Sequence, residues 1–374
     1  MENFEYYVTP DVCMTQNDKE LDKLRNEYPN VIYGAGLTAE SIINFIRKNG
    51  LEVNYCVVDD EYYKNDLKIL GIEVDNFSNL KSKIKKCNLI TGISADIVDN
   101  LKEDEFVQNV VYMHKIFEEN SQYLASFSMQ YSWLISNLEN LKHTYNLLED
   151  DLSKKTMLSF IKEHSGHISD EIPFLMDICV PNQYFNEIAP PQETCVLVDC
   201  GAFDGDSIKA CCEYFKGHKK VYALEPDEQV YNVLKKLEIP NTEINVFKAG
   251  ASDKSGKVYF WTYKGASKVV DYPTENSIDV IKIDDINIDR DVTFIKMDIE
   301  GSEESALKGA KETISTTMPT LAICVYHKID DLIRIPHLIE NLSRNNPSKK
   351  YKFFLRHHSH CELELVLYAI PCRK

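Results

Sequence analysis

The sequence lacks several features that would quickly place a chain in a broad class of protein. No run approaches the roughly 20 apolar residues that a membrane span needs, and the start, MENFEYYVTP, lacks the basic and apolar regions of a secretory signal. Basic residues are scarce too, with 42 Lys and Arg against 59 Asp and Glu and a net charge of −17. Nucleic acid and anionic membrane surfaces are therefore disfavoured as partners, because both are polyanions.

Cysteine is present but shows no recognisable pattern. The 11 cysteines include no C-x-x-C pair and their number is odd, so neither a disulfide framework nor a zinc site is supported. Internal repeats and low-complexity tracts are also absent. At 374 residues the chain is long enough for two domains that each bury a core. We therefore expect a cytoplasmic protein that binds a polar or cationic small molecule.

Residues 1–120 are predicted to form a small Rossmann-like α/β domain. NVIYGAGLTAESIINFIRKNG combines a short apolar strand, a turn with Gly34 and Gly36, and an amphipathic helix, and the strand NYCVVDD then ends in Asp59 and Asp60. In such a unit the helix N-terminus binds phosphate and an acidic residue binds ribose. The four residues are a candidate nucleotide or nucleotide-sugar site, and a glycine turn that only packs is the alternative.

Residues 121–190 follow a helical pattern, with apolar residues three and four positions apart, as in SWLISNLENLKHTYNLLEDD. The sequence IAPPQET breaks this pattern. We interpret the segment as a helical connecting region that leads into a second domain, residues 191–374.

The second domain begins with VLVDCGAFDGDS, a buried strand that enters a glycine-bearing turn and opens a helix. Further apolar strands alternate with amphipathic helices. The last two strands, YKFFLRHH and LELVLYAIP, are too close in sequence for a helical crossover, so they should pair as an antiparallel hairpin at the edge of a parallel sheet. Seven strands with such a closing hairpin are the arrangement of class I methyltransferases.

Polar residues gather at the carboxyl ends of these strands, the edge at which α/β sheets bind ligands. In chain order these strand ends carry Asp199, Glu225, Asp253, Asp298 with Glu300, His327, and Arg356 with His357 and His358.

The first turn is acidic, with Asp199, Asp204 and Asp206 where a phosphate-binding turn would offer bare amides or a lysine. S-adenosylmethionine has no phosphate. Its sulfonium and ammonium cations and its two ribose hydroxyls suit carboxylates, so this cofactor fits the turn better than a dinucleotide does.

Glu225 has the spacing of a carboxylate that accepts both ribose hydroxyls, and Asp253 is placed for the adenine amino group. Glycines in the first turn let the backbone approach the ligand. The predicted cofactor-binding residues are Asp199, Gly201, Ala202, Phe203, Asp204, Gly205, Glu225, Pro226, Ala251, Ser252, Asp253 and Asp298.

A hydroxyl acceptor needs a group that removes its proton, and a neutral imidazole suits that task near pH 7. Asp298, Glu300 and His327, at adjacent strand ends, are the predicted catalytic residues. The same three side chains could instead hold a divalent cation that lowers the pKa of the bound hydroxyl, and the sequence leaves both mechanisms open. The candidate substrate-binding residues are Tyr184, His327, His357 and His358.

The second domain resembles the FkbM-type methyltransferases over about residues 151–371. QYF, VDCGAFDGDS, EPD, GASDKSG, IKIDDI, FIKMDIEGSEESALKGA and VYHKIDDLIRIPHLI are similar to the successive motifs of that family. The resemblance implies an S-adenosylmethionine-dependent enzyme that methylates a hydroxyl of a sugar, nucleotide sugar, glycan precursor or polyketide-like alcohol. The first domain is similar instead to the nucleotide-sugar-binding domain of some sugar acyltransferases.

Two other functions remain open, an NAD-dependent oxidoreductase acting on a sugar nucleotide and a non-catalytic nucleotide-binding protein. Against the first, residues 1–120 offer no obvious catalytic Tyr-Lys or Cys-His arrangement. Against the second, the acidic residues and the histidine at the strand ends favour a working site. The expected partner is a small molecule, and a homodimer is compatible with the sequence.

Overall fold

The computed structural model describes most of the chain, namely residues 4–8, 21–35, 37–60, 62–64, 66–91, 101, 104–112, 131–165, 171–189, 193–263, 266–270, 272–288, 291–343, 350–359 and 363–372. The chain divides into two compact units. The first comprises Met1–Leu138, Lys155–Ile178 and Ser359–Glu362, and the second comprises Glu139–Lys154, Cys179–His358 and Leu363–Lys374. The predicted domain boundaries at residues 120 and 190 stay predictions.

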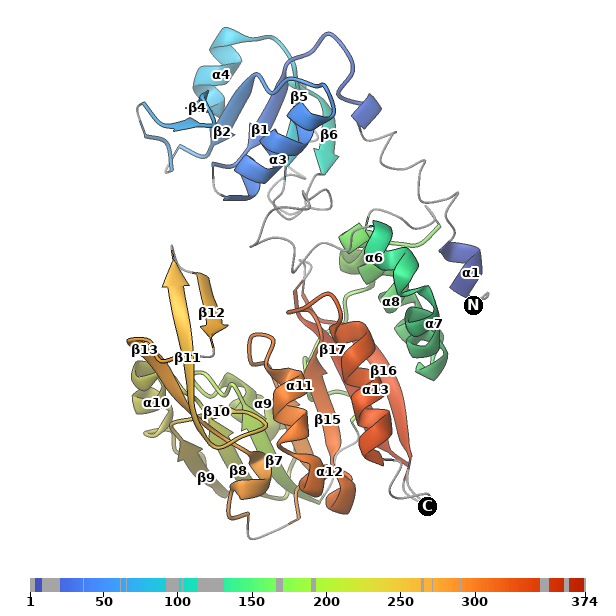
Figure 1. The fold of residues 1–374 in the computed structure, drawn as a ribbon, viewed down its shortest axis with the longest axis vertical. Helices are drawn as coiled ribbons and strands as arrows, with labels where there is room; N and C mark the ends of the chain where they lie inside the picture. Colours follow the sequence, from blue (N-terminus) through green and yellow to red (C-terminus); the bar gives the residue numbers. More distant parts are fainter. Residues whose placement is uncertain are drawn as a thin grey trace. The chain divides into compact units, whose positions relative to one another are not determined.

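The first unit contains a six-stranded sheet in the order β3-β4-β2-β1-β5-β6 (Figure 1). All neighbouring strands are parallel except β3, which pairs antiparallel with β4. The helix α3 buries Ile42, Ile43 and Ile46, the apolar face that the sequence predicts. The strands are β1 (Asn30–Tyr33), β2 (Tyr55–Val58), β3 (Lys68–Ile69), β4 (Ile72–Asn76), β5 (Cys87–Thr91) and β6 (Val107–Tyr112), and the helices are α1 (Phe4–Tyr7), α3 (Leu37–Lys48) and α4 (Phe77–Lys83).

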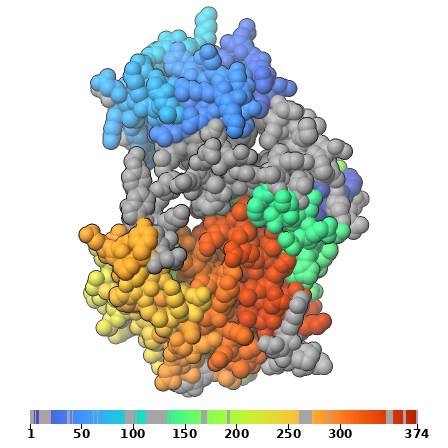
Figure 2. Space-filling model, in the orientation of Figure 1, coloured from blue at the N-terminus to red at the C-terminus, as the bar shows by residue number. Residues whose placement is uncertain are grey.

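Helices occupy part of the segment predicted to be helical. They are α6 (Tyr131–Ser136), α7 (Leu138–Leu147), α8 (Asp151–Ser165) and the 3-10 helix η1 (Leu175–Ile178). In the second unit, α7 lies against α13 (Asp331–Ser343), as the adjoining green and orange-red surfaces of Figure 2 show, and Nε2 of His143 lies 3.2 Å from Oε2 of Glu340.

Among the described residues, no helix is both long and apolar enough to cross a membrane.

The second unit is built on a seven-stranded sheet in the order β16-β17-β15-β14-β7-β8-β9. Five strands are parallel, and β17 pairs antiparallel with both β15 and β16, which confirms the predicted sheet with its closing hairpin. The strands are β7 (Thr194–Cys200), β8 (His218–Leu224), β9 (Thr242–Phe247), β14 (Phe294–Met297), β15 (Thr320–Cys324), β16 (Tyr351–His357) and β17 (Leu365–Pro371).

Short helices connect these strands, and the sheet core is apolar. Phe185 packs against Phe294 and Phe215, with ring centroids 5.0 and 5.9 Å apart. All three rings are buried, so the segment just before β7 is fixed to the sheet. Besides α13 the connecting helices are α9 (Asp206–Tyr214), α10 (Glu228–Leu234), η2 (Ile283–Asp285), α11 (Glu303–Lys308) and α12 (Lys311–Thr317).

A second sheet is inserted between β9 and β14, and the sequence analysis did not predict it. Its four strands lie in the order β10-β13-β11-β12, and the β11–β12 hairpin is antiparallel (Figure 1). The strands are β10 (Gly250–Ala251), β11 (Gly256–Tyr263), β12 (Ala266–Val270) and β13 (Asn276–Ile281).

Candidate active site

Asp199, at the end of β7, is fully buried and occupies the centre of the carboxyl edge of the sheet. Its Oδ2 accepts a hydrogen bond of 2.5 Å from Ser207 Oγ, and its Oδ1 lies 3.3 Å from Nζ of Lys296. Lys296 Nζ also donates to the carbonyl of Gly201 at 2.7 Å. Burial alone lowers the pKa of Lys296, but the charges of Asp199 and Asp298 outweigh it and raise that pKa. The lysine is therefore a fixed cation beneath the first turn.

The first turn brings the backbone close to the neighbouring strand end. Gly201 has φ +77°, and a Cβ there would lie 2.0 Å from the carbonyl oxygen of Asp298. Gly205 has φ +86° and precedes α9. Ala202 is buried between them, while Phe203 is 60% exposed at the tip of the turn.

Glu225 follows β8 and is buried, and both its carboxylate oxygens face the first turn and its own loop. Oε2 accepts a hydrogen bond from Phe203 N at 3.0 Å, and Oε1 accepts one from Asp227 N at 2.9 Å. Burial raises the pKa of Glu225 despite these bonds. Pro226 follows it and is half-buried.

The loop that carries Ala251, Ser252 and Asp253 is held against α11. Asp253 N donates to Ser305 Oγ at 3.1 Å. Ala251 and Ser252 are buried, whereas Asp253 is exposed. Asp204 in the first turn is exposed as well.

Asp298, directly after β14, accepts hydrogen bonds from two tyrosine hydroxyls. Tyr184 OH donates to its Oδ2 at 2.9 Å, and Tyr326 OH donates to its Oδ1 at 3.3 Å. Burial, together with Cys324 and Asp298, raises the pKa of Tyr184, so its phenol keeps its proton and acts as a donor. Tyr184, predicted from the sequence to bind the substrate, thus has its hydroxyl hydrogen-bonded to Asp298, and its substrate role stays a prediction.

His327, after β15, lies among three carboxylates. Its Nε2 is 3.5 Å from Asp298 Oδ1 and 3.7 Å from Glu300 Oε2, and its Nδ1 is 2.9 Å from Glu303 Oε1. Burial by itself lowers the pKa of His327, but Glu303, followed by Asp298 and Glu300, raises it above its ordinary value. The predicted catalytic residues Asp298, Glu300 and His327 are thus brought together.

Backbone strain is also found at this edge. Tyr184, Phe203 and Glu300 have φ angles of 65°, 43° and 55°, a region that non-glycine residues rarely enter. Such conformations persist only where the surroundings hold them, and they concentrate at functional sites.

His358 has both ring nitrogens engaged inside the fold. Nδ1 donates to the Val180 carbonyl at 2.9 Å, and Nε2 accepts from Tyr368 OH at 2.8 Å, because that phenol already accepts from Tyr184 N and from Asn186. Burial lowers the pKa of His358 to about 4. His357 is fully buried. The assignment of both histidines to substrate binding stays a prediction.

In the first unit, Asp59 and Asp60 are exposed after β2, and Asp59 Oδ1 accepts a hydrogen bond of 2.6 Å from Tyr33 OH. Gly34 directly follows β1. Gly36, the other predicted member of this nucleotide site, lies outside the described residues.

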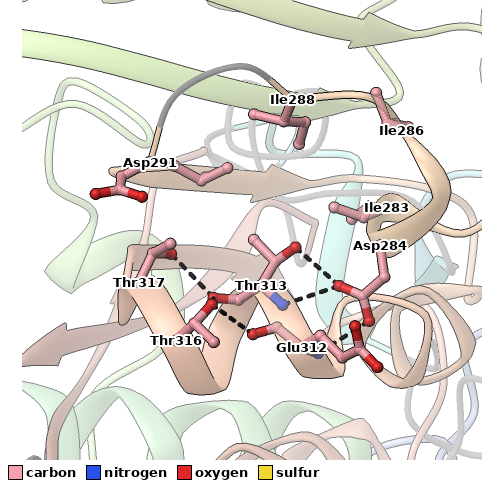
Figure 3. A pocket seen from close by; sticks show the side chains of 10 residues that line it. Ile283, Asp284, Ile286, Ile288, Asp291, Glu312, Thr313, Thr316 and Thr317 are labelled. Carbon is pink, nitrogen blue, oxygen red and sulfur yellow. Dashed lines mark hydrogen bonds between the residues drawn. The ribbon is translucent and has the colours of Figure 1, made fainter.

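A hollow of about 390 Å³ opens on the second unit away from these residues (Figure 3). Asp291 and Val292, which precede β14, help to line it, so it lies at the amino end of that strand. Within it Asp284 accepts from the backbone of Glu312 and Thr313 at 2.9 Å. These bonds fix the start of α12 and place no reactive group in the hollow.

Four residues of the site were not assigned a role from the sequence. Lys296, Glu303, Tyr326 and Glu364 all lie at the carboxyl edge. Glu364 accepts a hydrogen bond from Gln183, and burial raises its pKa, to which the Asp298 charge adds. Only Glu303 had a sequence signal, as the last residue of the stretch DIEGSE, residues 298–303, within the family-like motif FIKMDIEGSEESALKGA.

Residues 199–346 match the family model described as the methyltransferase FkbM domain. The whole chain is similar to the crystal structure of methyltransferase FkbM from Methylobacillus flagellatus KT, with 24% identity, a TM-score of 0.68, and 95% of this chain and 93% of that chain covered. A structure described as a pericyclic reaction enzyme covers 64% of this chain and 54% of its own, with 12% identity and a TM-score of 0.26. No curated protein matches the chain.

Proposed function

We propose that the chain, whose residues 199–346 match the methyltransferase FkbM domain model, is a methyltransferase that transfers a methyl group from S-adenosylmethionine to a hydroxyl oxygen of a sugar or a nucleotide-linked sugar. The observation that carries the proposal is the joint placement of Asp298 and His327, 3.5 Å apart, at the ends of neighbouring strands. A carboxylate and an imidazole are the groups that remove a proton from a hydroxyl.

The described residues fit the cofactor through their charge and position. Asp199, Asp298 and Glu225 place three carboxylates along the carboxyl edge, with Lys296 as a buried counter-charge to the first two. A sulfonium and an ammonium are favoured there, whereas a pyrophosphate is repelled. When bound, S-adenosylmethionine supplies an electrophilic methyl group on sulfur and departs as a neutral thioether.

In the proposed arrangement, Glu225 receives the ribose hydroxyls while keeping its hydrogen bonds to backbone amides. Tyr184 holds Asp298 in place, and Asp298 orients the acceptor hydroxyl. The hydroxyl proton passes to one acceptor, either the Asp298 carboxylate or the His327 imidazole, as the new carbon–oxygen bond forms, and Glu300 fixes the partner group.

The first unit supports an acceptor that carries a nucleotide. β1 lies between β2 and β5, so strand order reverses there, and Gly34 and Asp59 follow two adjacent strands at that point. Open α/β sheets bind nucleotides at such a reversal. The first unit is proposed to hold the nucleotide part of the acceptor.

The direct test is incubation of the purified chain with S-adenosylmethionine and a panel of free sugars, amino sugars and nucleotide sugars, followed by mass spectrometry and quantification of S-adenosylhomocysteine. We expect an acceptor-dependent product that carries one added methyl group on oxygen. Methylation confined to the nitrogen of an amino sugar would overturn the hydroxyl assignment.

A further inference from the structure

Three side chains of different chemistry converge at the carboxyl edge from three separate elements. Asp298 follows β14, Glu303 is the first residue of α11, and His327 follows β15. Each offers one oxygen or nitrogen atom, and these atoms lie within 4.8 Å of one another. Ligand atoms at about 2.0–2.2 Å from a central ion are separated by no more than roughly twice that distance, so the cluster is close to the size of a metal site.

The burial of Glu303 is the second observation. Its side chain is fully buried, and its Oε2 has no hydrogen-bond partner among the described residues. The contact between Oε1 and Nδ1 of His327 is short, at 2.9 Å, but is not aligned as a hydrogen bond. Oε1 accepts a hydrogen bond from Ile299 N at 2.9 Å, whereas a buried carboxylate oxygen without a partner, such as Oε2, is costly unless a cation or a donor satisfies it.

Among the described contacts, neighbouring lysines form no ion pair with Glu303 or His327, although the Asp298 charge acts on Lys296. Lys296 Nζ is engaged by Asp199 and by the carbonyl of Gly201, and Lys328 Nζ donates to the carbonyl of Gly301. Glu300, whose side chain is 93% exposed, adds a further carboxylate 3.7 Å from His327 Nε2. The carboxylates of Asp298, Glu300 and Glu303 therefore surround the His327 imidazole, and a cation from outside the chain would be favoured beside them.

We propose that Asp298, Glu303 and His327 bind a divalent cation of the kind that accepts both carboxylate and imidazole ligands, such as Mn²⁺ or Zn²⁺. The ligand set differs from the one predicted from sequence, because the buried Glu303 takes the place of the exposed Glu300.

This inference rests on the proposed function and selects the metal-assisted version of its chemical step. A cation at this point binds the acceptor hydroxyl and lowers its pKa. The oxygen–hydrogen bond then breaks, its proton passes to the Glu300 carboxylate, the oxygen takes the methyl group, and the carbon–sulfur bond releases the thioether. His327 serves as a ligand in this scheme.

The cation site is tested by titrating the full-length, chelator-treated chain with Mn²⁺ in the absence of cofactor and acceptor. Loss of the free-ion electron paramagnetic resonance signal counts bound Mn²⁺, and calorimetry with Zn²⁺ and Mg²⁺ ranks the ions. We expect one Mn²⁺ per chain and weaker binding of Mg²⁺. Absence of stoichiometric binding of both Mn²⁺ and Zn²⁺ would overturn the proposal.

Glu303→Gln should lower Mn²⁺ affinity at least tenfold, and Glu304→Gln is the matched control. Glu304 is the next residue of α11, but it pairs with Lys308 and Arg334 instead. Asp298→Asn is a second variant for the case in which Glu303→Gln does not fold, because Asp298 is partly exposed. Equal Mn²⁺ affinity in the folded ligand variants and in the control would also overturn the site.

The two proposals fail in different ways. If the chain binds Mn²⁺ but methylates no hydroxyl acceptor, the proposed function is wrong and the cation site stands. If hydroxyl methylation continues at an undiminished rate in excess chelator and no Mn²⁺ binds, the cation site is wrong and the proposed function stands.

Discussion

In the proposed function, individual residues at the carboxyl edge have two separable tasks, holding the cofactor and activating the acceptor. Glu225 and the first turn are proposed for the first task, and the cluster around Asp298 is proposed for the second. The two groups come from different strands, so substitutions should separate affinity for S-adenosylmethionine from the rate of methyl transfer.

Glu225→Ala should weaken binding of S-adenosylmethionine. The variant loses two charge-assisted hydrogen bonds to ribose, each worth about 1.5–3 kcal/mol, and calorimetry measures the loss. Glu228→Ala is the control, since Glu228 is exposed on α10 and pairs only with Lys248 among the contacts described. Wild-type affinity in the Glu225 variant would remove the ribose assignment.

His327→Ala and Asp298→Asn should bind S-adenosylmethionine nearly as the wild type does but lose turnover. Loss of a group that activates the acceptor typically lowers the rate by about 10²- to 10⁴-fold. Single-turnover rates on the identified acceptor are the measurement. Rates within a few-fold of wild type in both variants would place the catalytic centre elsewhere.

His358 should make the second unit sensitive to acid. Because burial lowers its folded pKa to about 4 from 6.5, the unfolded chain binds a proton between these values that the folded chain does not. Stability from this group is therefore present above pH 6.5 and is lost as pH falls toward 4, by on the order of 3 kcal/mol. Urea unfolding of wild type and His358→Gln at pH 7 and 4.5 should show a smaller pH effect in the variant, and equal pH effects would contradict the prediction.

At the scale of elements, the sheet brings β7 and β14 so close at their carboxyl ends that only glycine fits the turn after β7. A Cβ on Gly201 would collide with the carbonyl of Asp298, at 2.0 Å. The turn after β7 and the end of β14 are thus a single packing unit.

Gly201→Ala should therefore destabilise the second unit and abolish cofactor binding. We expect a loss greater than the roughly 1–3 kcal/mol of backbone strain alone, measured by urea unfolding. Gly256→Ala is the control that measures backbone strain without a steric collision. Gly256 has φ +144°, and a Cβ added there would meet no atom of the described residues within 4 Å. Equal losses in both variants would show that the close approach to Asp298 has no energetic consequence.

Across the whole molecule, the chain joins a unit whose strand order reverses beside β1 to a unit in which residues 199–346 match the methyltransferase FkbM domain. The similarity to the FkbM structure covers 95% of this chain, so that protein has a counterpart of the first unit as well.

The first unit should bind a nucleotide or a nucleotide sugar through the loops after β1 and β2. Thermal-shift measurements on the full-length chain should show stabilisation by such a compound and less stabilisation of Asp60→Ala, whose carboxylate is exposed. If no nucleotide shifts the melting temperature and free sugars are methylated equally well, the first unit is structural.

The inserted β10–β13 sheet marks a limit of prediction from sequence. Its strands are short or lie in the segment FWTYKGASKVVDYP, where apolar and polar residues mix without a clear period. Pairing of β10 with β13 joins residues 250–251 to 280–281. Such a register depends on the partner strand and leaves little trace in local sequence.

The sequence by itself determined the alternation of strands and helices in the main sheet of the second unit, its closing hairpin and the strand-end positions of Asp199, Glu225, Asp298 and His327. These features depend on the local periodicity of apolar residues and on the length of the connections, and both can be read directly from the sequence. The tertiary structure alone decided that Lys296 neutralises Asp199, that Tyr184 donates to Asp298, and that Glu303 is buried beside His327. Such contacts join residues from separate elements, and their geometry depends on how strands and helices pack, which no local pattern specifies.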